Sequence, residues 1–102
     1  MTGPPDAAPA VEARQRIDKW LWHARLARTR AAAKAIAVSG HVRINREKNR
    51  AAAHLLRTGD VLTINIGGQV RVLRVRGIAE RRGSAADATY LYEEIGPGLP
   101  AR

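Results

Sequence analysis

The residues of this sequence best suited to chemistry are the basic side chains of its N-terminal half. Residues 14–50 contain eleven lysines and arginines but only two acidic residues, Asp18 and Glu47. The rest of the chain holds seven basic and seven acidic residues, so the whole formal charge of +9 lies in this one segment. A one-sided positive field attracts a polyanion. The charge distribution therefore predicts a nucleic acid, or less favourably an anionic membrane, as the ligand.

A predicted helix over residues 30–39 carries the densest group of these cations. Thr29 is a favourable N-cap for this helix, and Gly40 suits the position just after its last turn. Small inward side chains would let the helix lie close to its neighbour. The residues expected to face inward are Ala32, Ala35 and Ile36.

The outward face of this helix presents Arg30 and Lys34 one turn apart, with Arg28 just before it. The planar guanidinium of arginine can donate two hydrogen bonds to one phosphate. An ordinary solvated helix face is the alternative, but the concentration of the net charge favours phosphate binding. Reversal of charge at Arg81 and Arg82 is expected to matter less for binding than reversal at Arg30 and Lys34. The candidate cations are Arg16, Lys19, Arg25, Arg28, Arg30, Lys34, Arg43, Arg46 and Lys48.

Two other side chains belong to a predicted first helix over residues 16–26. Asp18 is expected to order a neighbouring arginine such as Arg30, or to cap the helix, because a carboxylate facing phosphate would be repelled. Trp22 is expected to pack with Leu26 beneath another element. The alternative is an exposed indole that stacks on an unpaired base.

The remaining polar residues show no pattern typical of catalysis or metal binding. His23, His41 and His54 lack the i, i+4 spacing of a metal-binding helix, and the sequence has no cysteine. Glu93 and Glu94 are adjacent, so they cannot face each other as a catalytic pair. We find no Walker loop and no nucleophile–base arrangement. We therefore expect no catalysis, no cofactor, no metal and no small-molecule substrate.

The periodicity of the apolar residues predicts an α+β domain over residues 14–95. Two N-terminal helices are expected, followed by the strands of a small, mostly antiparallel sheet. Residues 46–50 are interpreted as a charged turn, and 51–56 are ambiguous. Strands are expected at residues 41–45, 61–66 and 69–78, with a bulge between Val72 and Leu73.

The C-terminal part of this domain has two interpretations. Ser84 and Asp87 resemble a capping box, which predicts a helix over residues 84–95. Ala88, Leu91, Tyr92 and Ile95 recur at helical spacing, and a strand at 89–93 is the alternative.

Both ends of the chain are expected to be flexible tails, residues 1–13 and 96–102, because they are rich in proline, glycine and alanine. No segment approaches the ~18 apolar residues of a membrane span, and the N-terminus lacks the apolar region of a secretory signal. We expect a cytoplasmic monomer that does not bind membranes.

The order of these features resembles the S4-type RNA-binding domain, also called the alpha-L motif. That family shows R-[LI]-D-x-x-L on its first helix and [ST]-R-x-x-A-x-x-x-I on its second. A glycine, a short strand ending in asparagine, and a Gly-Asp pair then follow. The matching positions are Arg16, Ile17, Asp18, Leu21, Thr29, Arg30, Ala33, Ala37, Gly40, Val42, Asn45, Gly59 and Asp60. The sequence departs from the pattern at Ile36, one place early, and at Arg46, where the family usually has glycine.

The stretches DKWLW, TR, AERRG and LYEE extend the resemblance, from about Arg16 to Glu94, to the short ribosome-associated heat-shock members of this family. Those members also carry a long basic C-terminal extension, and this sequence ends at Arg102. The resemblance implies a non-catalytic domain that binds structured RNA, with Thr29 in its binding motif. It further implies ribosomal RNA of the large subunit as the target.

Other functions compete with this interpretation. Two helices across a short turn could bind duplex DNA, although the second helix offers no Asn or Gln to read adenine. S4-type domains also occur in RNA-modifying enzymes, so the chain could be the RNA-targeting subunit of a separate enzyme. An anionic membrane is disfavoured because no helix combines a basic face with a bulky apolar one.

Overall fold

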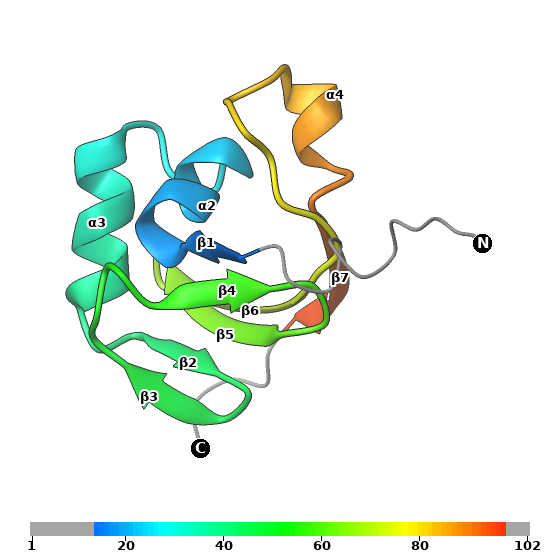
Figure 1. The fold of residues 1–102 in the computed structure, drawn as a ribbon. Coiled ribbons are helices and arrows are strands. Elements are labelled where there is room, and N and C mark those ends of the chain that lie inside the picture. The colour runs from blue at the N-terminus through cyan, green and yellow to red at the C-terminus, as the bar shows by residue number, and fades with distance from the viewer. Residues whose placement is uncertain (1–13, 98–102) are drawn as a thin grey trace.

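The hydrophobic core lies between helix α2 and one face of an antiparallel sheet (Figure 1). The computed structural model of the chain describes residues 14–97. Its helices are α2 (Ile17–His23), α3 (Arg30–Val38) and α4 (Ala85–Ala88). Its strands are β1 (Arg14–Arg16), β2 (Val42–Ile44), β3 (Glu47–Asn49), β4 (Leu55–Arg57), β5 (Val61–Ile66), β6 (Gln69–Val75) and β7 (Tyr92–Pro97). The predicted α+β class is confirmed.

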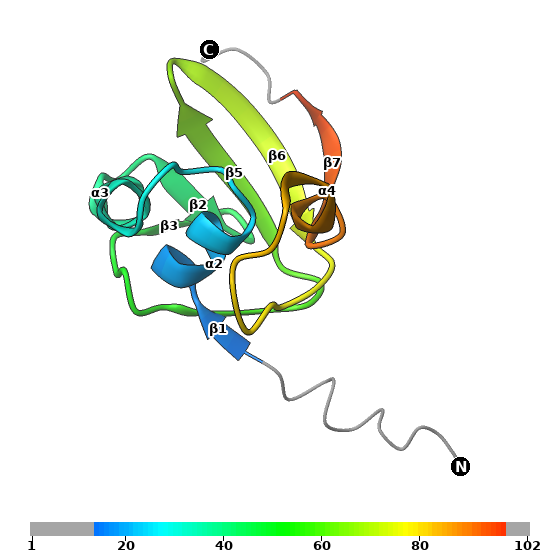
Figure 2. The ribbon, with the colours of Figure 1, turned by 90° about the horizontal axis from the view of Figure 1, so that it is seen from above.

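The main sheet has five antiparallel strands in the order β3-β2-β5-β6-β7, and β1 and β4 form a separate two-stranded ribbon. Alternation along β5 and β6 sends Leu62, Ile64 and Leu73 into the core, where each is fully buried. Two views related by a 90° turn both place α2 between α3 and the segment that leads to α4 (Figures 1 and 2).

Helix α2 is shorter than the predicted helix over residues 16–26 because its C-terminus closes after His23. Arg25 adopts a left-handed φ of 59°. Its N–H donates to the Trp22 carbonyl at 3.1 Å, and the Leu26 N–H donates to the Leu21 carbonyl at 3.0 Å. This is the hydrogen-bond pattern of a Schellman motif, with arginine where glycine is usual.

The N-terminus of α2 is held by the segment between β3 and β4 rather than by a side-chain cap. The Ile17 N–H donates to the His54 carbonyl at 2.8 Å, and the Asp18 N–H donates to the Ala52 carbonyl at 3.3 Å. Both donors belong to the first turn, where N–H groups have no partner inside the helix. The ambiguous residues 51–56 therefore cap α2 and then enter β4, which pairs with β1.

Residues 77–83, which we call the strap, run beside α2 after β6 ends (Figure 2). The buried Trp20 donates its indole N–H to the Gly77 carbonyl at 2.9 Å. Gln15 donates its side-chain amide to the Ala79 carbonyl at 2.7 Å. The strap thus satisfies polar groups of the N-terminal elements that would otherwise be buried without partners. The predicted strand over residues 69–78 is accordingly too long, since β6 ends at Val75.

Helix α3 matches the prediction at both ends. The Thr29 hydroxyl accepts from the Ala32 N–H at 2.9 Å, as expected of an N-cap. Its inward face, however, differs from the prediction, because Ala33 and Ala37 are fully buried while Ala35 is exposed. The smallest side chains lie at the closest approach to the core, and Ile36 packs at its edge.

The predicted charged turn over residues 46–50 is wrong. Residues Glu47–Asn49 form β3, and the turn is the two-residue connection Asn45–Arg46. Both turn residues have positive φ, 51° for Asn45 and 78° for Arg46. Two-residue hairpins with positive φ at both positions favour Asn-Gly, because a side chain in that region is strained. Arg46 therefore carries strain at the tip of this hairpin.

Replacing Arg46 by glycine is expected to raise the free energy of unfolding by about 0.5–1 kcal/mol, because relief of left-handed strain exceeds the entropy cost of glycine. Urea unfolding would measure the change. The matched variant Arg46→Ala removes the charge but keeps a strained side chain, so it should not gain stability. Equal stabilisation by both variants would contradict the assignment of strain.

The C-terminal prediction is right at its start and wrong afterwards. Ser84 and Asp87 form the expected capping box, but α4 ends at Ala88, and residues 92–97 are a strand. The predicted irregularity at Val72 and Leu73 is confirmed as a register shift against β7. The extra residue is Ile95 on β7, since Val72 pairs with Gly96 and Leu73 with Glu94.

Pairing of charges explains why the last segment is a strand. The side chain of Arg71 on β6 is only 27% exposed. Its guanidinium donates two hydrogen bonds to Glu94, at 2.9 and 2.7 Å. Arg74 and Arg76 both contact Glu93. Cross-strand pairs of this kind stabilise β7 against β6. The predicted C-terminal tail, residues 96–102, begins too early, because Gly96 and Pro97 belong to β7. Residues 98–102 and the predicted N-terminal tail, residues 1–13, lie outside the described residues.

Candidate nucleic-acid interface

The exposed face of α3 presents Arg30 and Lys34, and Arg28 precedes the helix. Within residues 14–97, Arg28 and Lys34 form no ion pair with an acidic side chain. Positions 30 and 34 border the buried stripe of Ala33 and Ala37, because residues three, four and seven apart lie on the same side of a helix. Both cations nevertheless remain exposed, at the edge of α3 where Arg30 approaches Asp18 of α2. These cations are therefore available to an external anion.

Asp18 joins two of the candidate cations at the base of this surface. Its carboxylate is only 2% exposed and accepts hydrogen bonds from Arg16 at 3.1 and 2.9 Å. Arg30 lies 3.9 Å from the same carboxylate. The two arginine side chains nevertheless stay 49% and 47% exposed, so Asp18 orders them without covering them. The structure agrees with the supporting role predicted for Asp18.

The charge of Asp18 is stabilised in the folded protein. Burial alone would raise its pKa, but the hydrogen bonds and charge of Arg16, the Lys19 backbone N–H and the charge of Arg30 outweigh burial. The pKa of Asp18 consequently lies below its ordinary value. The carboxylate remains ionised at neutral pH and holds both arginines in place.

Trp22 lies between two guanidinium groups. The Arg30 guanidinium carbon is 6.0 Å from the indole centroid, and that of Arg82 is 5.2 Å away. Arg82 also donates to the Trp22 carbonyl at 3.1 Å and approaches the Ala27 carbonyl at 3.5 Å. The indole is partly buried and, like Leu26, packs against the core, so it is not a free base-stacking face. Cation–π contacts instead fix Arg30 beside α2.

Arg82 lies next to this surface through its contacts with Trp22, a position that the sequence analysis did not predict. Sequence spacing could not reveal this, because Arg82 reaches Trp22 across sixty positions of the chain. The only signal was its place in the AERRG stretch of the resemblance. Arg82 carries a further positive charge to the group formed by Arg16, Arg30 and Lys34.

Other candidates on the helix pair have more constrained positions. Lys19 is partly buried. Arg25 is exposed, but its guanidinium donates to the Gly83 carbonyl of the strap at 3.1 and 2.7 Å. One end of the Arg25 guanidinium is thus committed to holding the strap.

The hairpin candidates form a second group. Arg43 and Lys48 are direct cross-strand partners on β2 and β3. Because Val42 and Ile44 on either side of Arg43 are buried, strand alternation turns Arg43 and Lys48 away from the core. Arg46 lies at the exposed hairpin tip. The structure therefore divides the predicted cations into two groups. One group lies on what we call the α2–α3 surface, formed by Arg16, Arg28, Arg30 and Lys34, and the other lies on the β2–β3 hairpin.

His23 supports the interface from inside. It is 1% exposed, and its Nδ1 lies 2.9 Å from the Ala79 carbonyl, which requires an N–H on that nitrogen. Burial lowers the pKa of His23, and the nearby charges of Lys19, Arg30 and Arg82 lower it further, against the opposing effect of the Ala79 carbonyl. The imidazole is therefore neutral at neutral pH.

Acidification is expected to destabilise the fold through His23. The unfolded chain binds a proton near the ordinary histidine pKa of about 6.5, whereas the folded chain binds it only at lower pH. The stability that the neutral His23 contributes to the fold is fully present above the ordinary histidine pKa. It is lost as the pH falls below that value toward the lower pKa of the folded state. Thermal melts between about pH 7.5 and 5.5 should show a smaller loss for His23→Asn, whose amide can donate to the same carbonyl. If the exposed control His41→Asn showed the same reduction in the acid-induced loss of stability, the effect could not be assigned to His23.

No helix of residues 14–97 is long and apolar enough to cross a membrane. In the same part of the chain, no three His, Cys, Asp or Glu side chains are grouped so that they could hold a metal ion.

Comparison with known proteins identifies the family. The S4 domain family matches residues 15–62, the segment from β1 to the start of β5. Heat shock protein 15 of Escherichia coli (strain K12) is 36% identical over 94 residues, covering 92% of this chain and 68% of that protein. The chain belongs to the heat shock protein 15 family. The resemblance inferred from the sequence is thereby confirmed.

Other members of the heat shock protein 15 family agree with this assignment. The Haemophilus influenzae homolog is 32% identical over 92 residues, covering 90% of this chain and 70% of its own. The solved structure of heat shock protein 15 from Vibrio cholerae has a TM-score of 0.73 and 31% identity, covering 80% of this chain and 82% of that one. That structure is trimeric. The S4 domain and these heat shock protein 15 relatives support RNA binding by this chain.

Proposed function

We propose that this protein binds structured RNA without catalysing a reaction, and that its target is ribosomal RNA of the large subunit. The observation that carries the proposal is the α2–α3 surface. Asp18 orders the half-exposed Arg16 and Arg30 there, while the exposed Lys34 lies one helical turn further along. Ordered guanidinium groups lose less freedom on binding phosphate than mobile ones, which favours a rigid phosphate backbone.

The same surface favours folded RNA over single strands and over duplex DNA. Both guanidinium groups next to Trp22 compete with a nucleobase for its indole faces. The outward face of α3 otherwise offers alanines such as Ala31 and Ala35, which cannot read base edges by hydrogen bonds. Recognition would rest on backbone position and shape, as in folded RNA.

The ribosomal target rests on the heat-shock resemblance and on family membership. A ribosomal target implies a cytoplasmic protein. We further propose a monomer, and Thr29, Lys19, Arg28, Arg43, Arg46 and Lys48 as additional contact residues. Analytical ultracentrifugation would distinguish a monomer from a trimer like that of the Vibrio cholerae relative.

Salt dependence tests the electrostatic part of the proposal. If about 5 phosphates are neutralised, log Kd against log salt should have a slope magnitude of about 3.5–4.5. Filter binding to a purified ribosomal RNA fragment would measure this slope. A slope near zero would exclude phosphate contacts as the source of affinity.

Co-sedimentation tests the target. Isolated large subunits should retain the protein at salt concentrations where small subunits and random duplex DNA release it. Crosslinking in cells followed by sequencing should recover mainly large-subunit RNA. Recovery of mostly messenger RNA or DNA would overturn the ribosomal assignment.

A further inference from the structure

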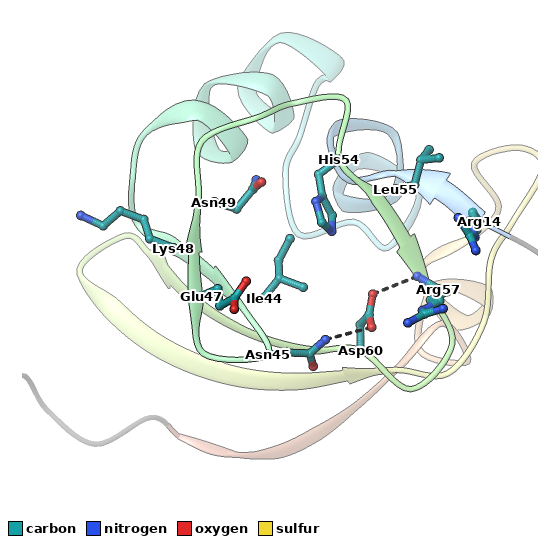
Figure 3. Close-up of a pocket in the computed structure, with 10 residues that line it drawn as sticks. All are labelled: Arg14, Ile44, Asn45, Glu47, Lys48, Asn49, His54, Leu55, Arg57 and Asp60. Atoms are coloured by element: carbon teal, nitrogen blue, oxygen red, sulfur yellow. Dashed lines mark hydrogen bonds between the residues drawn. The ribbon is translucent and has the colours of Figure 1, made fainter.

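A hollow of about 550 Å³ opens between the β2–β3 hairpin and β4. Its volume lies within the range of small-molecule sites. Figure 3 shows Ile44 on its floor and the side chains of Glu47 and Asn49 directed inward from β3, with His54 and Leu55 on the opposite side. Lys48 points away from it, as strand alternation requires. The hollow is therefore distinct from the exposed face of α3.

Two side chains of β3, the exposed Glu47 and the largely buried Asn49, direct hydrogen-bond acceptors into this hollow. Asn49 is only 9% exposed and uses its Nδ2 to donate to the Ala51 carbonyl at 3.1 Å. No donor among residues 14–97 reaches its Oδ1, and the Glu47 carboxylate forms no ion pair there. A bound group that supplies N–H donors would satisfy both side chains.

Asp60, by contrast, is a fixed part of the wall. Its two carboxylate oxygens accept from the Asn45 side chain and from the Arg57 backbone N–H, each at 3.1 Å. The Asn45 side-chain oxygen in turn accepts from the Val61 N–H at 2.9 Å. These bonds hold the floor of the hollow against the hairpin, so the two acceptors on β3 face a preformed site.

Two arginines lie at the rim. Arg14 of β1 and Arg57 of β4 are direct partners in the antiparallel register and both are exposed. Neither forms an ion pair with an acidic side chain of the described residues. Like charges directly opposite each other destabilise a strand pair. A phosphate bridging the two guanidinium groups would relieve this repulsion.

We propose that the hollow binds one unpaired guanine nucleotide of the RNA, with the base inside and its phosphate at the rim. The proposal rests on the RNA-binding function proposed above. A carboxylate only accepts hydrogen bonds, and the Watson–Crick edge of guanine presents two adjacent N–H donors. Glu47 receives this edge, Asn49 adds an acceptor, and Arg14 and Arg57 bind the phosphate. Uracil, which presents one donor between two acceptors, fits less well.

Titration of the full chain with mononucleotides tests this site independently of RNA binding. Guanosine monophosphate should shift the backbone NMR signals of Ile44, Asn49 and His54. It should bind about fivefold to a hundredfold more tightly than uridine monophosphate, as expected of one bidentate pair. Glu47→Gln should remove this preference, whereas the control Glu80→Gln, an exposed carboxylate outside the hollow, should keep it.

Three outcomes would overturn the proposal: no shift of these signals, equal binding of the two nucleotides, or an unchanged guanine preference in Glu47→Gln. Inorganic phosphate producing the same shifts as the nucleotide would likewise reduce the site to an anion site without a base. None of these outcomes bears on the α2–α3 surface. The RNA affinity of the charge-reversal variant at Arg30 and Lys34 tests that surface separately.

Discussion

Reversal of charge at Arg30 and Lys34, by Arg30→Glu with Lys34→Glu, is expected to weaken RNA binding at least about 100-fold. Each charge-assisted hydrogen bond contributes about 1.5–3 kcal/mol, and each 1.4 kcal/mol corresponds to tenfold in affinity. Arg30 is half-exposed and ordered by Asp18, and Lys34 is free of ion pairs in the described chain. Electrophoretic mobility shift at fixed salt would measure the loss.

The matched control is Arg74→Glu with Arg76→Glu, which changes the net charge equally. Both residues contact Glu93 at the β6–β7 side of the molecule and contact none of the α2–α3 cations. Arg82 cannot serve as a remote control, because it stacks on Trp22. Circular dichroism should confirm that both double variants are folded. Equal loss of affinity in the two would show that binding responds to net charge alone and is not localised.

Truncation of Trp20 to alanine is expected to remove about 3–5 kcal/mol of stability, the usual cost of deleting a buried aromatic side chain. Trp20 is fully buried, packs edge-to-face on Tyr92 with ring centroids 6.3 Å apart, and donates to the Gly77 carbonyl. The free energy of unfolding of a small domain is about 5–15 kcal/mol, so this variant would lose a large part of it. Urea unfolding would measure the change.

Two further variants separate the causes. Trp20→Phe keeps much of the apolar volume but leaves the Gly77 carbonyl without its donor, so about 1–3 kcal/mol should be lost. Trp22→Ala removes the same type of side chain from a partly buried position and should cost less than Trp20→Ala. If the two alanine variants lost equal stability, Trp20 would not be the central packing residue described here.

Local signals in the sequence predicted the elements that are determined locally. Thr29 caps α3, and Gly40 follows the helix with a φ of +89°. Each of these residues acts through its own backbone conformation or through a partner a few positions away. Such interactions can be inferred without knowing the rest of the fold.

Elements that depend on distant partners were missed. β1 and β4 have three residues each and exist because they pair with each other across some forty positions. Tyr92 and Ile95 of β7 have helical spacing in the sequence. The segment is nevertheless a strand, in which Glu93 and Glu94 form ion pairs with Arg74 and Arg71 on β6. Tertiary pairing overrides weak local preference in such short segments.

The site was predicted in the same uneven way. Clustering of charge led to the candidates Arg16, Arg30 and Lys34, which lie close in sequence, and the structure brings Arg16 and Arg30 to the same carboxylate of Asp18. Arg82 was missed because its approach depends on the strap. The face of the sheet to which Arg43 and Lys48 point also required the register of β2 and β3.

The strap has a consequence for the order in which the protein matures. Trp20, His23 and Arg25 depend on carbonyl groups of Gly77, Ala79 and Gly83, and Arg82 completes the contacts of Trp22. A growing polypeptide reaches the helix pair first and these partners some sixty codons later. The two helices cannot reach their final arrangement on a nascent chain that lacks residues 77–83. The RNA-binding surface is therefore completed late in synthesis, when the strap has been made and has packed against α2.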